Sequence, residues 1–363
     1  MNTDLFIERL KIDSTSGMEG DFAAFLEERF KTPGCRIERF PVESMGSFNL
    51  LFSWGTPKVI FCSHLDTVPP YIPPTIGEDN LLHGRGTCDA KGQIFAMYEA
   101  CLELEKSGRT DFGLLLLAGE ETGSFGAKAF NSMMSEADSM EDVWLVVGEP
   151  TDNHMASAAK GTKSFEVEFE GEAFHSGYPQ YGRSAVMMFN EFMNALRSIG
   201  FPHDPVLGET TWNIGKLHSD NPQNILSDKL TCRVYFRTTF ESDEMVCNVM
   251  KNMAGPGAKL RFGRPKVQDG SDIVAKDVAD WQRYMKVTDF GGDAPTRFEV
   301  LDGFPSKPVS FGSDAPQLKC FRNKILCGPG SILTAHRDNE HISLGDLETA
   351  VQNYINIYKL VVE

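Results

Sequence analysis

The sequence predicts an α/β protein with a mostly parallel sheet, into which a smaller α+β domain is inserted. Apolar runs typical of buried strands, such as Phe112 to Ala118, follow helical patterns, such as Gly92 to Lys106. Strands that alternate with helices indicate a parallel sheet with helices on its faces. In the middle of the chain the pattern changes, because apolar residues alternate with glutamates over residues 165–170. That alternation predicts a strand with one face in water, as in an antiparallel sheet covered on one side.

The first domain is expected to open with a helix. Residues 16–19 (SGME) have the pattern of a capping box, and large apolar residues between Phe22 and Phe30 fall on one helical face. The other elements predicted for this domain are strands at residues 59–62, 112–118, 143–147 and 324–326 and helices at 92–106 and 344–360.

The inserted domain is predicted to span residues 163–267 and to have a βαββαβ-like order. After the strand at 165–170, the expected elements are a helix at 184–199, strands at 211–217 and 230–238, a helix at 243–253 and a strand at 259–262. The stretch from Gly263 to Gly270 contains glycine and proline and is expected to return the chain to the first domain. The first domain is therefore predicted to comprise residues 1–162 and 268–363.

The net charge of the chain excludes some classes of binding partner. The 363 residues include 35 Lys plus Arg and 51 Asp plus Glu, for a net charge of −16. Such a charge disfavours nucleic acids and anionic membrane surfaces as partners. No apolar run approaches the roughly 20 residues that span a bilayer, and the amino terminus lacks an export signal pattern. The eight cysteines are scattered without CxxC spacing, which predicts reduced thiols and a cytoplasmic location.

Acidic and imidazole side chains come directly after the predicted strands at 59–62, 112–118 and 143–147. In an open α/β sheet the carboxyl ends of the strands are where ligands gather, so these side chains are expected to converge. Catalytic zinc prefers nitrogen and oxygen ligands, and paired ions about 3.5 to 4 Å apart can activate an amide for hydrolysis. The sequence therefore predicts a two-metal hydrolase centre. Its candidate residues are His64, Asp89, Glu120, Glu121, Glu149 and His336.

The residues also indicate roles within this centre. Asp89 is expected to bridge both ions, and Asp66 to orient the His64 imidazole from behind. Of the adjacent acids Glu120 and Glu121, one is expected to bind metal while the other acts as general base.

Two further motifs have competing interpretations. The segment GRGTCDAKG at residues 84–92 contains GxG before a helix, as a dinucleotide-binding loop does. It lacks the third glycine and ends in an acid where a pyrophosphate would lie, so a metal ligand explains Asp89 better. His175 lies inside the predicted insert, and from the residues alone we expect a structural histidine.

Six ordered motifs resemble those of the M20 metallopeptidases, and within them the branch of acetylornithine deacetylase and succinyl-diaminopimelate desuccinylase. The motifs are SHLDTVP (63–69), GRGTCDAKG (84–92), GEETGSFGA (119–127), GEPT (148–151), HSGYP (175–179) and GPGSILTAHRDNEHI (328–342). The loop at residues 311–316 (FGSDAP) looks most like the acetylornithine deacetylases.

The resemblance implies a role for each candidate residue. His64 and Glu149 would bind one zinc ion, Glu121 and His336 the other, and Asp89 both, with Co²⁺ or Mn²⁺ as possible substitutes. Glu120 would be the general base. The inserted domain would mediate a homodimer and present His175 to the partner's active site, which replaces the structural interpretation. The substrate would be held by Asn224, Arg237, Gly312 and Ser313.

The resemblance implies a cytoplasmic N-acyl amino acid deacylase of arginine biosynthesis. The expected substrate is N2-acetyl-L-ornithine or a relative such as acetylcitrulline or succinylornithine. The alternative is a dipeptidase or carboxypeptidase with the same centre, because peptide and N-acyl bonds are both amides. A non-catalytic binding protein on the same scaffold is the third hypothesis.

Overall fold

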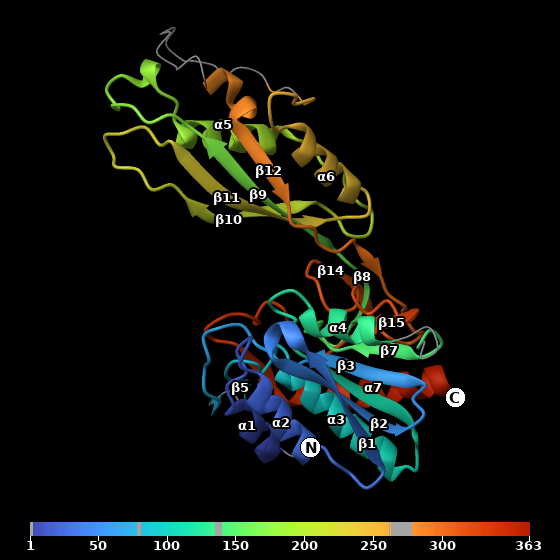
Figure 1. Ribbon diagram of the computed structural model, residues 1–363. Coiled ribbons are helices and arrows are strands. Elements are labelled where there is room, and N and C mark those ends of the chain that lie inside the picture. The colour runs from blue at the N-terminus through green and yellow to red at the C-terminus, as the bar shows by residue number, and fades with distance from the viewer. Residues whose placement is uncertain (1–2, 78–80, 135–139, 261, 263–277) are drawn as a thin grey trace. The chain divides into compact units, whose positions relative to one another are not determined.

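The computed structural model describes residues 3–77, 81–134, 140–260, 262 and 278–363, and the chain divides into two compact units (Figure 1). The first unit extends to Ala158 and includes Arg297–Val309 and Ser313–Glu363. The second comprises Ala159–Thr296 and Ser310–Gly312. The second unit thus begins close to the predicted insert but continues to Thr296 rather than residue 267. The predicted return of the chain at residues 263–270 lies outside the described residues.

The first unit is built on a six-stranded mixed sheet with the order β1-β2-β6-β3-β7-β15. Strands β6, β3, β7 and β15 pair in parallel, whereas β2 is antiparallel to both of its neighbours. The strands are β1 (Cys35–Val42), β2 (Ser47–Gly55), β3 (Val59–His64), β6 (Asp111–Leu117), β7 (Trp144–Val147) and β15 (Asn323–Leu326). The mostly parallel sheet predicted from the sequence is confirmed.

Helices cover both faces of this sheet. On one face α3 and α7 pack against each other and against β3, and the Phe30 ring at the end of α2 stacks on Tyr98 of α3 at 3.6 Å. On the other face the Phe130 ring of α4 packs edge-on against Phe40 of β1 at 4.9 Å. The helices are α1 (Thr3–Leu10), α2 (Gly20–Arg29), α3 (Lys91–Lys106), α4 (Phe125–Met133) and α7 (Leu344–Val362).

Short elements complete the chain. One small sheet has the order β16-β5-β4 and another the order β13-β8-β14. These strands are β4 (Thr75–Ile76), β5 (Leu81–His83), β8 (Met155–Ala159), β13 (Thr296–Arg297), β14 (Ser306–Val309) and β16 (His341–Ser343). The 3-10 helices are η1 (Glu43–Met45), η3 (Pro179–Tyr181) and η4 (Val278–Tyr284).

The second unit is a four-stranded antiparallel sheet with two helices on one face. Its strand order is β10-β11-β9-β12, and α5 and α6 both contact β9 and β11. Along β9 buried and partly exposed residues alternate, so the predicted strand with one wet face is confirmed. The elements are β9 (Gly161–Glu170), α5 (Ala185–Ser198), β10 (Thr211–His218), β11 (Lys229–Thr238), α6 (Asp243–Asn252) and β12 (Met285–Asp289).

The βαββαβ order is therefore as predicted, but the last strand is not. The described residues 259, 260 and 262 are not in a strand, while Arg261 lies outside the described residues. The final position is taken by β12, whose Met285 and Val287 lie opposite Phe169 and Val167 of β9. This pairing explains why the second unit extends beyond residue 267.

The predicted capping box at residues 16–19 is also absent. Helix α2 begins at Gly20, and its N-cap Glu19 makes no side-chain cap bond to the helix. The Glu19 carboxylate instead accepts a hydrogen bond from the Gly17 N–H at 2.6 Å. The Ser16 hydroxyl donates to Asp66 at 2.7 Å, so this segment bonds to the loop after β3 rather than to its own helix.

Within the described part of the chain, no helix combines the length and the apolar content needed to cross a membrane.

Substitution of Gly92, at the start of α3, tests the close approach of this helix to the preceding loop. A Cβ atom there would lie 2.2 Å from the carbonyl oxygen of Thr87, so Gly92→Ala must displace either the helix or the loop before it. We expect this variant to lower the free energy of unfolding by about 1 to 3 kcal/mol, measured by urea denaturation. A Cβ at Gly20 would meet nothing within 4 Å, so Gly20→Ala is the matched control. Equal stability of the two variants would contradict the close approach.

Candidate metal centre

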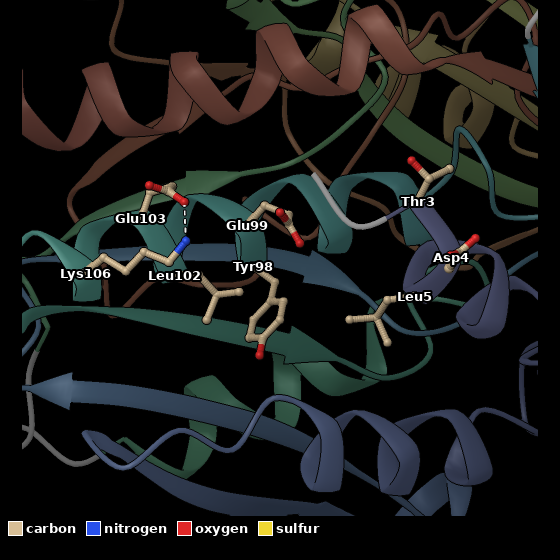
Figure 2. Close-up of a pocket in the computed structure, with 8 residues that line it drawn as sticks. All are labelled: Thr3, Asp4, Leu5, Tyr98, Glu99, Leu102, Glu103 and Lys106. Carbon is tan, nitrogen blue, oxygen red and sulfur yellow. Dashed lines mark hydrogen bonds and ion pairs between the residues drawn. The ribbon is translucent and has the colours of Figure 1, made fainter.

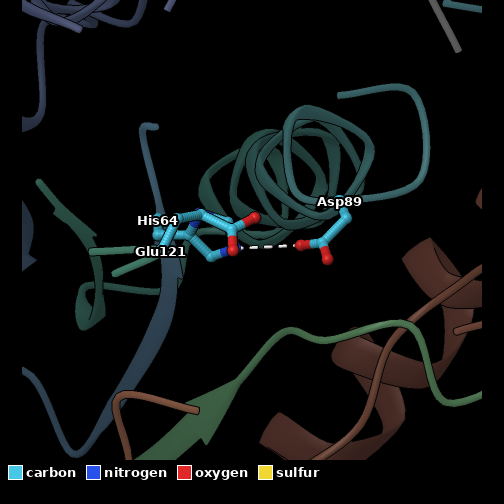
Figure 3. Close-up of side chains that lie close together, drawn as sticks. All are labelled: His64, Asp89 and Glu121. Carbon is cyan, nitrogen blue, oxygen red and sulfur yellow. Dashed lines mark hydrogen bonds and ion pairs between the residues drawn. The ribbon is translucent and has the colours of Figure 1, made fainter. Parts of the chain in front are cut away.

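The predicted ligands follow the ends of parallel strands in the first unit. His64 is the last residue of β3, Glu121 follows β6, and Glu149 follows β7. Because β6, β3 and β7 run in the same direction, their carboxyl ends lie at one edge of the sheet. There His64, Asp89 and Glu121 bring one ligand atom each within 4.8 Å of one another (Figure 3).

Asp89 lies between the two predicted histidine ligands. Its Oδ1 is 2.9 Å from His64 Nε2, and its Oδ2 is 3.3 Å from His336 Nε2. His336 Nε2 is also 2.8 Å from Glu121 Oε1. One carboxylate therefore contacts both imidazoles through different oxygens, as a bridging ligand would.

Asp66 is fully buried behind this group. Its backbone carbonyl oxygen is 2.9 Å from His64 Nδ1, whereas its carboxylate Oδ1 is 3.6 Å away. The carboxylate accepts the backbone N–H groups of Glu120 and Glu121 at 3.0 and 3.2 Å. Asp66 thus contacts His64 mainly through its carbonyl, while its carboxylate holds the loop that carries the two acids.

Negative charge accumulates around the three grouped ligands. Glu149 and Asp314 are buried. Burial raises the pKa of Glu149 well above its usual range, and the nearby Asp89 carboxylate raises it further. Desolvation likewise raises the pKa of Glu120, to which Asp314 and Glu121 add. Glu149 and Glu120 thus interact electrostatically with acids of the ligand group, Asp89 and Glu121.

The pKa values of the two imidazoles are also raised, by their contacts with acids rather than by burial. Burial lowers the pKa of His64, but its contacts with Asp66 and Asp89 outweigh that effect and raise the pKa well above the usual value. Hydrogen bonds to Asp89 and Glu121 raise the pKa of His336 to about 10. The same contacts hold the pKa of Asp89 below its usual range, although burial opposes them. The acids thus favour positive charge at both imidazoles, as they would favour a bound cation.

His336 has a left-handed backbone conformation, with φ of 61°. For a residue with a side chain, this conformation costs roughly 1 to 3 kcal/mol and persists only where the surroundings fix it. It lies in the loop after β15, whose carboxyl end meets the same sheet edge.

The donor set fits zinc. Two imidazoles and several carboxylates are the ligand types that zinc takes, with Zn–N and Zn–O distances of about 2.0 to 2.2 Å. Ligand atoms on one tetrahedral ion then lie roughly 3.3 Å apart, and the contacts around Asp89 measure 2.9 and 3.3 Å. The contact of His64 Nδ1 with the Asp66 carbonyl directs Nε2 toward the ligand group, as outer hydrogen bonds do in metal sites.

The remaining predicted residues lie mostly in the second unit. His175 forms an isolated β-bridge with Ile225, and the Ser176 N–H donates to the Asn224 carbonyl at 2.9 Å. Arg237 lies in β11, and its Nη1 is 3.5 Å from the point where a Cβ on Gly312 would stand. His175 and Asn224 therefore lie on two paired segments, and Arg237 lies near Gly312. Ser313 belongs to the first unit, is buried, and accepts the Ala315 N–H at 3.4 Å.

The sequence interpretation missed several residues that support the centre. None of them directly follows a strand that was predicted to carry a ligand, although two lie inside the quoted motifs at residues 84–92 and 328–342. They are Ser16 on Asp66, Asp314 near Glu120, and Arg85, Gln93 and Glu340 around the Asp89 loop.

A separate surface pocket lies on α1 and α3 (Figure 2). It is lined by Thr3, Asp4, Leu5, Tyr98, Glu99, Leu102, Glu103 and Lys106. The dashed line marks the ion pair of Lys106 with Glu103, at 2.6 Å. This pocket contains none of the predicted catalytic or ligand residues, so it is distinct from the candidate centre.

Comparison with known proteins gives consistent matches. A family model described as peptidase family M20/M25/M40 matches residues 60–276. A probable carboxypeptidase of Aspergillus niger is 31% identical over 98% of this chain and 88% of its own. Another from Aspergillus oryzae is 33% identical over 82% and 73%. A tripeptidase structure from Staphylococcus aureus matches with a TM-score of 0.78 at 21% identity, covering 99% and 98% of the two chains. These relatives have peptidase names, not names of the expected acetylornithine deacetylase branch.

Proton competition at His336 gives a test of metal binding. Zinc needs a neutral imidazole, so at neutral pH it must displace the proton that the raised pKa of about 10 retains. Below that pKa the apparent zinc affinity is expected to rise by about tenfold per pH unit for each displaced proton. Calorimetric titration of chelator-treated protein between about pH 6 and 8 measures this slope.

The control for that titration is His218→Gln, because His218 is an exposed residue of β10. Its slope should match that of the unmodified protein. A zinc affinity that is independent of pH would contradict the proposed ligand role of His336.

Proposed function

Because the chain belongs to the peptidase family M20/M25/M40, we propose that it is a metal-dependent exopeptidase that releases the C-terminal amino acid of short peptides. Family membership makes it a metal-dependent hydrolase of amide bonds. The finer activity is supported by the probable carboxypeptidases that are 31% and 33% identical to it. The observation that carries the proposal is the contact of one carboxylate, Asp89, with both His64 and His336.

We propose two zinc ions as the resident metals. His64 and Glu149 would hold one, Glu121 and His336 the other, and Asp89 both. When bound, such a pair supplies a Lewis acid for the amide carbonyl and lowers the pKa of water. The contacts of Asp89 with two imidazoles through separate oxygens support this assignment.

In this proposal Glu120 is the general base. Desolvation and neighbouring acids raise the pKa of its carboxyl group, which suits a group that accepts and then returns a proton near neutral pH. Glu120 would take a proton from the attacking water and deliver it to the leaving amine nitrogen. Its backbone N–H is held by the Asp66 carboxylate at 3.0 Å, which fixes where the side chain begins.

Arg237 would bind the free carboxylate of the substrate, with Asn224, Gly312 and Ser313 contributing nearby contacts. A guanidinium can hold a carboxylate through two parallel hydrogen bonds. The scissile bond of a carboxypeptidase substrate has its nitrogen on an α-carbon that bears this carboxylate. Arg237 Nη1 lies near Gly312, a residue of the same unit, which supports this role.

The second candidate function is deacylation of an N-acyl amino acid such as N2-acetyl-L-ornithine. The observation that favours it is the loop at residues 311–316, which resembles that of the acetylornithine deacetylases. Such a substrate presents the same amide nitrogen and α-carboxylate as a peptide C-terminus, and differs only in the acyl group. Both activities are therefore compatible with the same centre, and the acyl group distinguishes them.

We also propose that the protein is a homodimer in which His175 acts on the partner's substrate. The supporting observation is that His175 lies in a partly apolar exposed region of the second unit. Phe174, Tyr178 and Tyr181 there are 41, 56 and 63% exposed. Exposed apolar groups of this kind mark interaction surfaces. All eight cysteines are free, and the cytoplasmic location stays a prediction.

A substrate panel tests the proposed activity. Zinc-loaded enzyme is offered dipeptides and tripeptides with a free C-terminus, the same peptides with a C-terminal amide, N-acetylornithine, acetylcitrulline and N-succinyl amino acids. Free peptides should be hydrolysed fastest. Their amidated forms should react about a hundredfold more slowly, since they lack the carboxylate for Arg237.

Glu120→Gln is the control for that panel, because it should bind zinc and show no turnover. Faster hydrolysis of N-acetylornithine than of any peptide would favour the second candidate. Equal rates for free and amidated peptides would refute recognition of the C-terminal carboxylate, and with it the proposed role of Arg237.

Co-expression of two inactive variants tests the role of His175. In a His175→Ala/Glu120→Gln mixed dimer, only an active site that takes His175 from the other subunit has both groups intact. Random pairing should then restore about a quarter of the unmodified activity. Each variant expressed alone gives the baseline, and a mixture that stays at this baseline would exclude action in trans.

A further inference from the structure

Among the described residues, Arg85 and Glu340 form the most thoroughly buried ion pair of an arginine or lysine with an acid. Arg85 Nη1 lies 2.6 Å from Glu340 Oε2, and the two side chains are 2 and 0% exposed. Neither residue belongs to the proposed ligand set. We propose that this pair positions the metal centre, by holding Asp89 and the His336 loop in the arrangement that two ions require. The inference rests on the proposed metal centre.

Glu340 fixes the backbone from which Asp89 projects. Its Oε1 accepts the N–H groups of Cys88 and Asp89 at 3.0 and 3.1 Å. Its own carbonyl accepts the Gly84 N–H at 3.0 Å. Three N–H groups of the 84–89 loop therefore donate to a single residue of the His336 loop.

Arg85 connects the same group to one further segment, at Pro70, and bonds the His336 loop a second time. Its Nε donates to the Pro70 carbonyl at 3.2 Å, and its Nη1 to the Arg337 carbonyl at 3.3 Å. Pro70 follows the His64 segment, and Arg337 is the residue after His336. The guanidinium thus contacts the chain one residue after His336 and six residues after His64.

The bonds of Arg85 and Glu340 also stabilise the strained backbone at His336. His336 has φ of 61°, and such a conformation persists only where its surroundings fix it. Bonds from Arg85 to the Arg337 carbonyl and to Glu340 hold the loop one and four residues after His336. Without them the loop is free to relax, and His336 Nε2 would leave its place beside Asp89.

Stability alone is a poor explanation for the pair. Removing two charges from water is costly, and well-packed apolar residues often stabilise a protein as well as a buried ion pair does. An apolar pair would, however, accept no backbone N–H and donate to no carbonyl. The distinctive contribution of Arg85 and Glu340 is the set of bonds to three loops, of which one holds Asp89 and another His336.

Two variants separate positioning from stability. Glu340→Gln removes the charge but keeps the size and one acceptor oxygen. Arg85→Lys keeps the charge pair but has no planar fork to reach Pro70, Arg337 and Glu340 together. Leu104→Ala is the control. Leu104 is a buried core residue near the end of α3 that lies away from these loops. Its substitution should lower the melting temperature without changing the bonds of Arg85 and Glu340.

Each protein is stripped of metal and titrated with Zn²⁺ by calorimetry and with Co²⁺ by absorption spectroscopy, and kcat and KM are then measured. We expect zinc affinity to fall 10- to 100-fold in Glu340→Gln and about tenfold in Arg85→Lys, as for other residues that orient metal ligands. The Co²⁺ spectrum should change, and kcat should fall more than KM rises. Leu104→Ala should bind both metals as the unmodified protein does.

Four outcomes overturn the inference. Unmodified protein that binds no metal refutes the proposed function as well. Normal metal binding by both variants refutes only the positioning role. Equal loss in Leu104→Ala shows that affinity merely follows stability. If Glu340→Gln does not fold, Arg85→Lys decides, and unmodified zinc affinity and kcat in that variant refute the proposal.

Discussion

The concentration of negative charge at one edge of the first unit's sheet is the constraint on which the rest of the structure depends. Asp89, Glu149 and Asp314 are buried there, and Glu120 and Glu121 lie beside them. Buried like charges raise one another's pKa and oppose folding unless cations or hydrogen bonds compensate them. In this chain the compensation comes from two imidazoles that contact Asp89 from opposite oxygens. A pair of divalent ions would supply the same compensation with more charge.

Such a cluster stays in place because its backbone is held from outside. The Asp66 carboxylate holds the Glu120 and Glu121 N–H groups, and Ser16 completes its bonding. The Gln93 amide donates to the carbonyls of Cys88 and Pro329 at 3.0 and 2.8 Å, which joins the Asp89 loop to the loop after β15. These bonds converge on peptide groups rather than on the acids themselves. The carboxylate oxygens of the ligands are thereby left to face one another and any bound cation.

Much of the fold was predictable because its signals are local. The strands before His64, Glu121 and Glu149 are short apolar runs, and the helix at residues 184–199 is amphipathic. The local pattern of apolar residues is therefore enough to predict these elements. The strand-end positions of the ligands follow from the parallel pairing that such alternation predicts. The sequence thus predicted the close approach of His64, Asp89, Glu121 and His336, whereas their roles stay predictions.

The errors arose where long-range contacts decide. Residues 16–19 match a capping box by pattern, but the Ser16 hydroxyl bonds Asp66, 50 positions away. The last strand of the second unit is Met285–Asp289 because its pairing with β9 buries Met285, and no local pattern at residues 259–262 reveals that competition. Arg85 and Glu340 are 255 positions apart. A buried ion pair between two motifs has no sequence period, so its role emerges only from the contacts.

The residues proposed to hold metal all lie in the first unit, and most of those proposed to hold the substrate lie in the second. The acids and imidazoles that would cleave an amide all lie in the first unit, whereas Arg237, Asn224 and His175 lie in the second. A peptide C-terminus and an N-acyl amino acid present the same amide nitrogen and the same α-carboxylate, so neither the centre nor a carboxylate-binding arginine has to differ between them. What must differ is the space for the acyl group. The constraints on the buried acids are therefore the same for both substrates, and the acyl group alone distinguishes them.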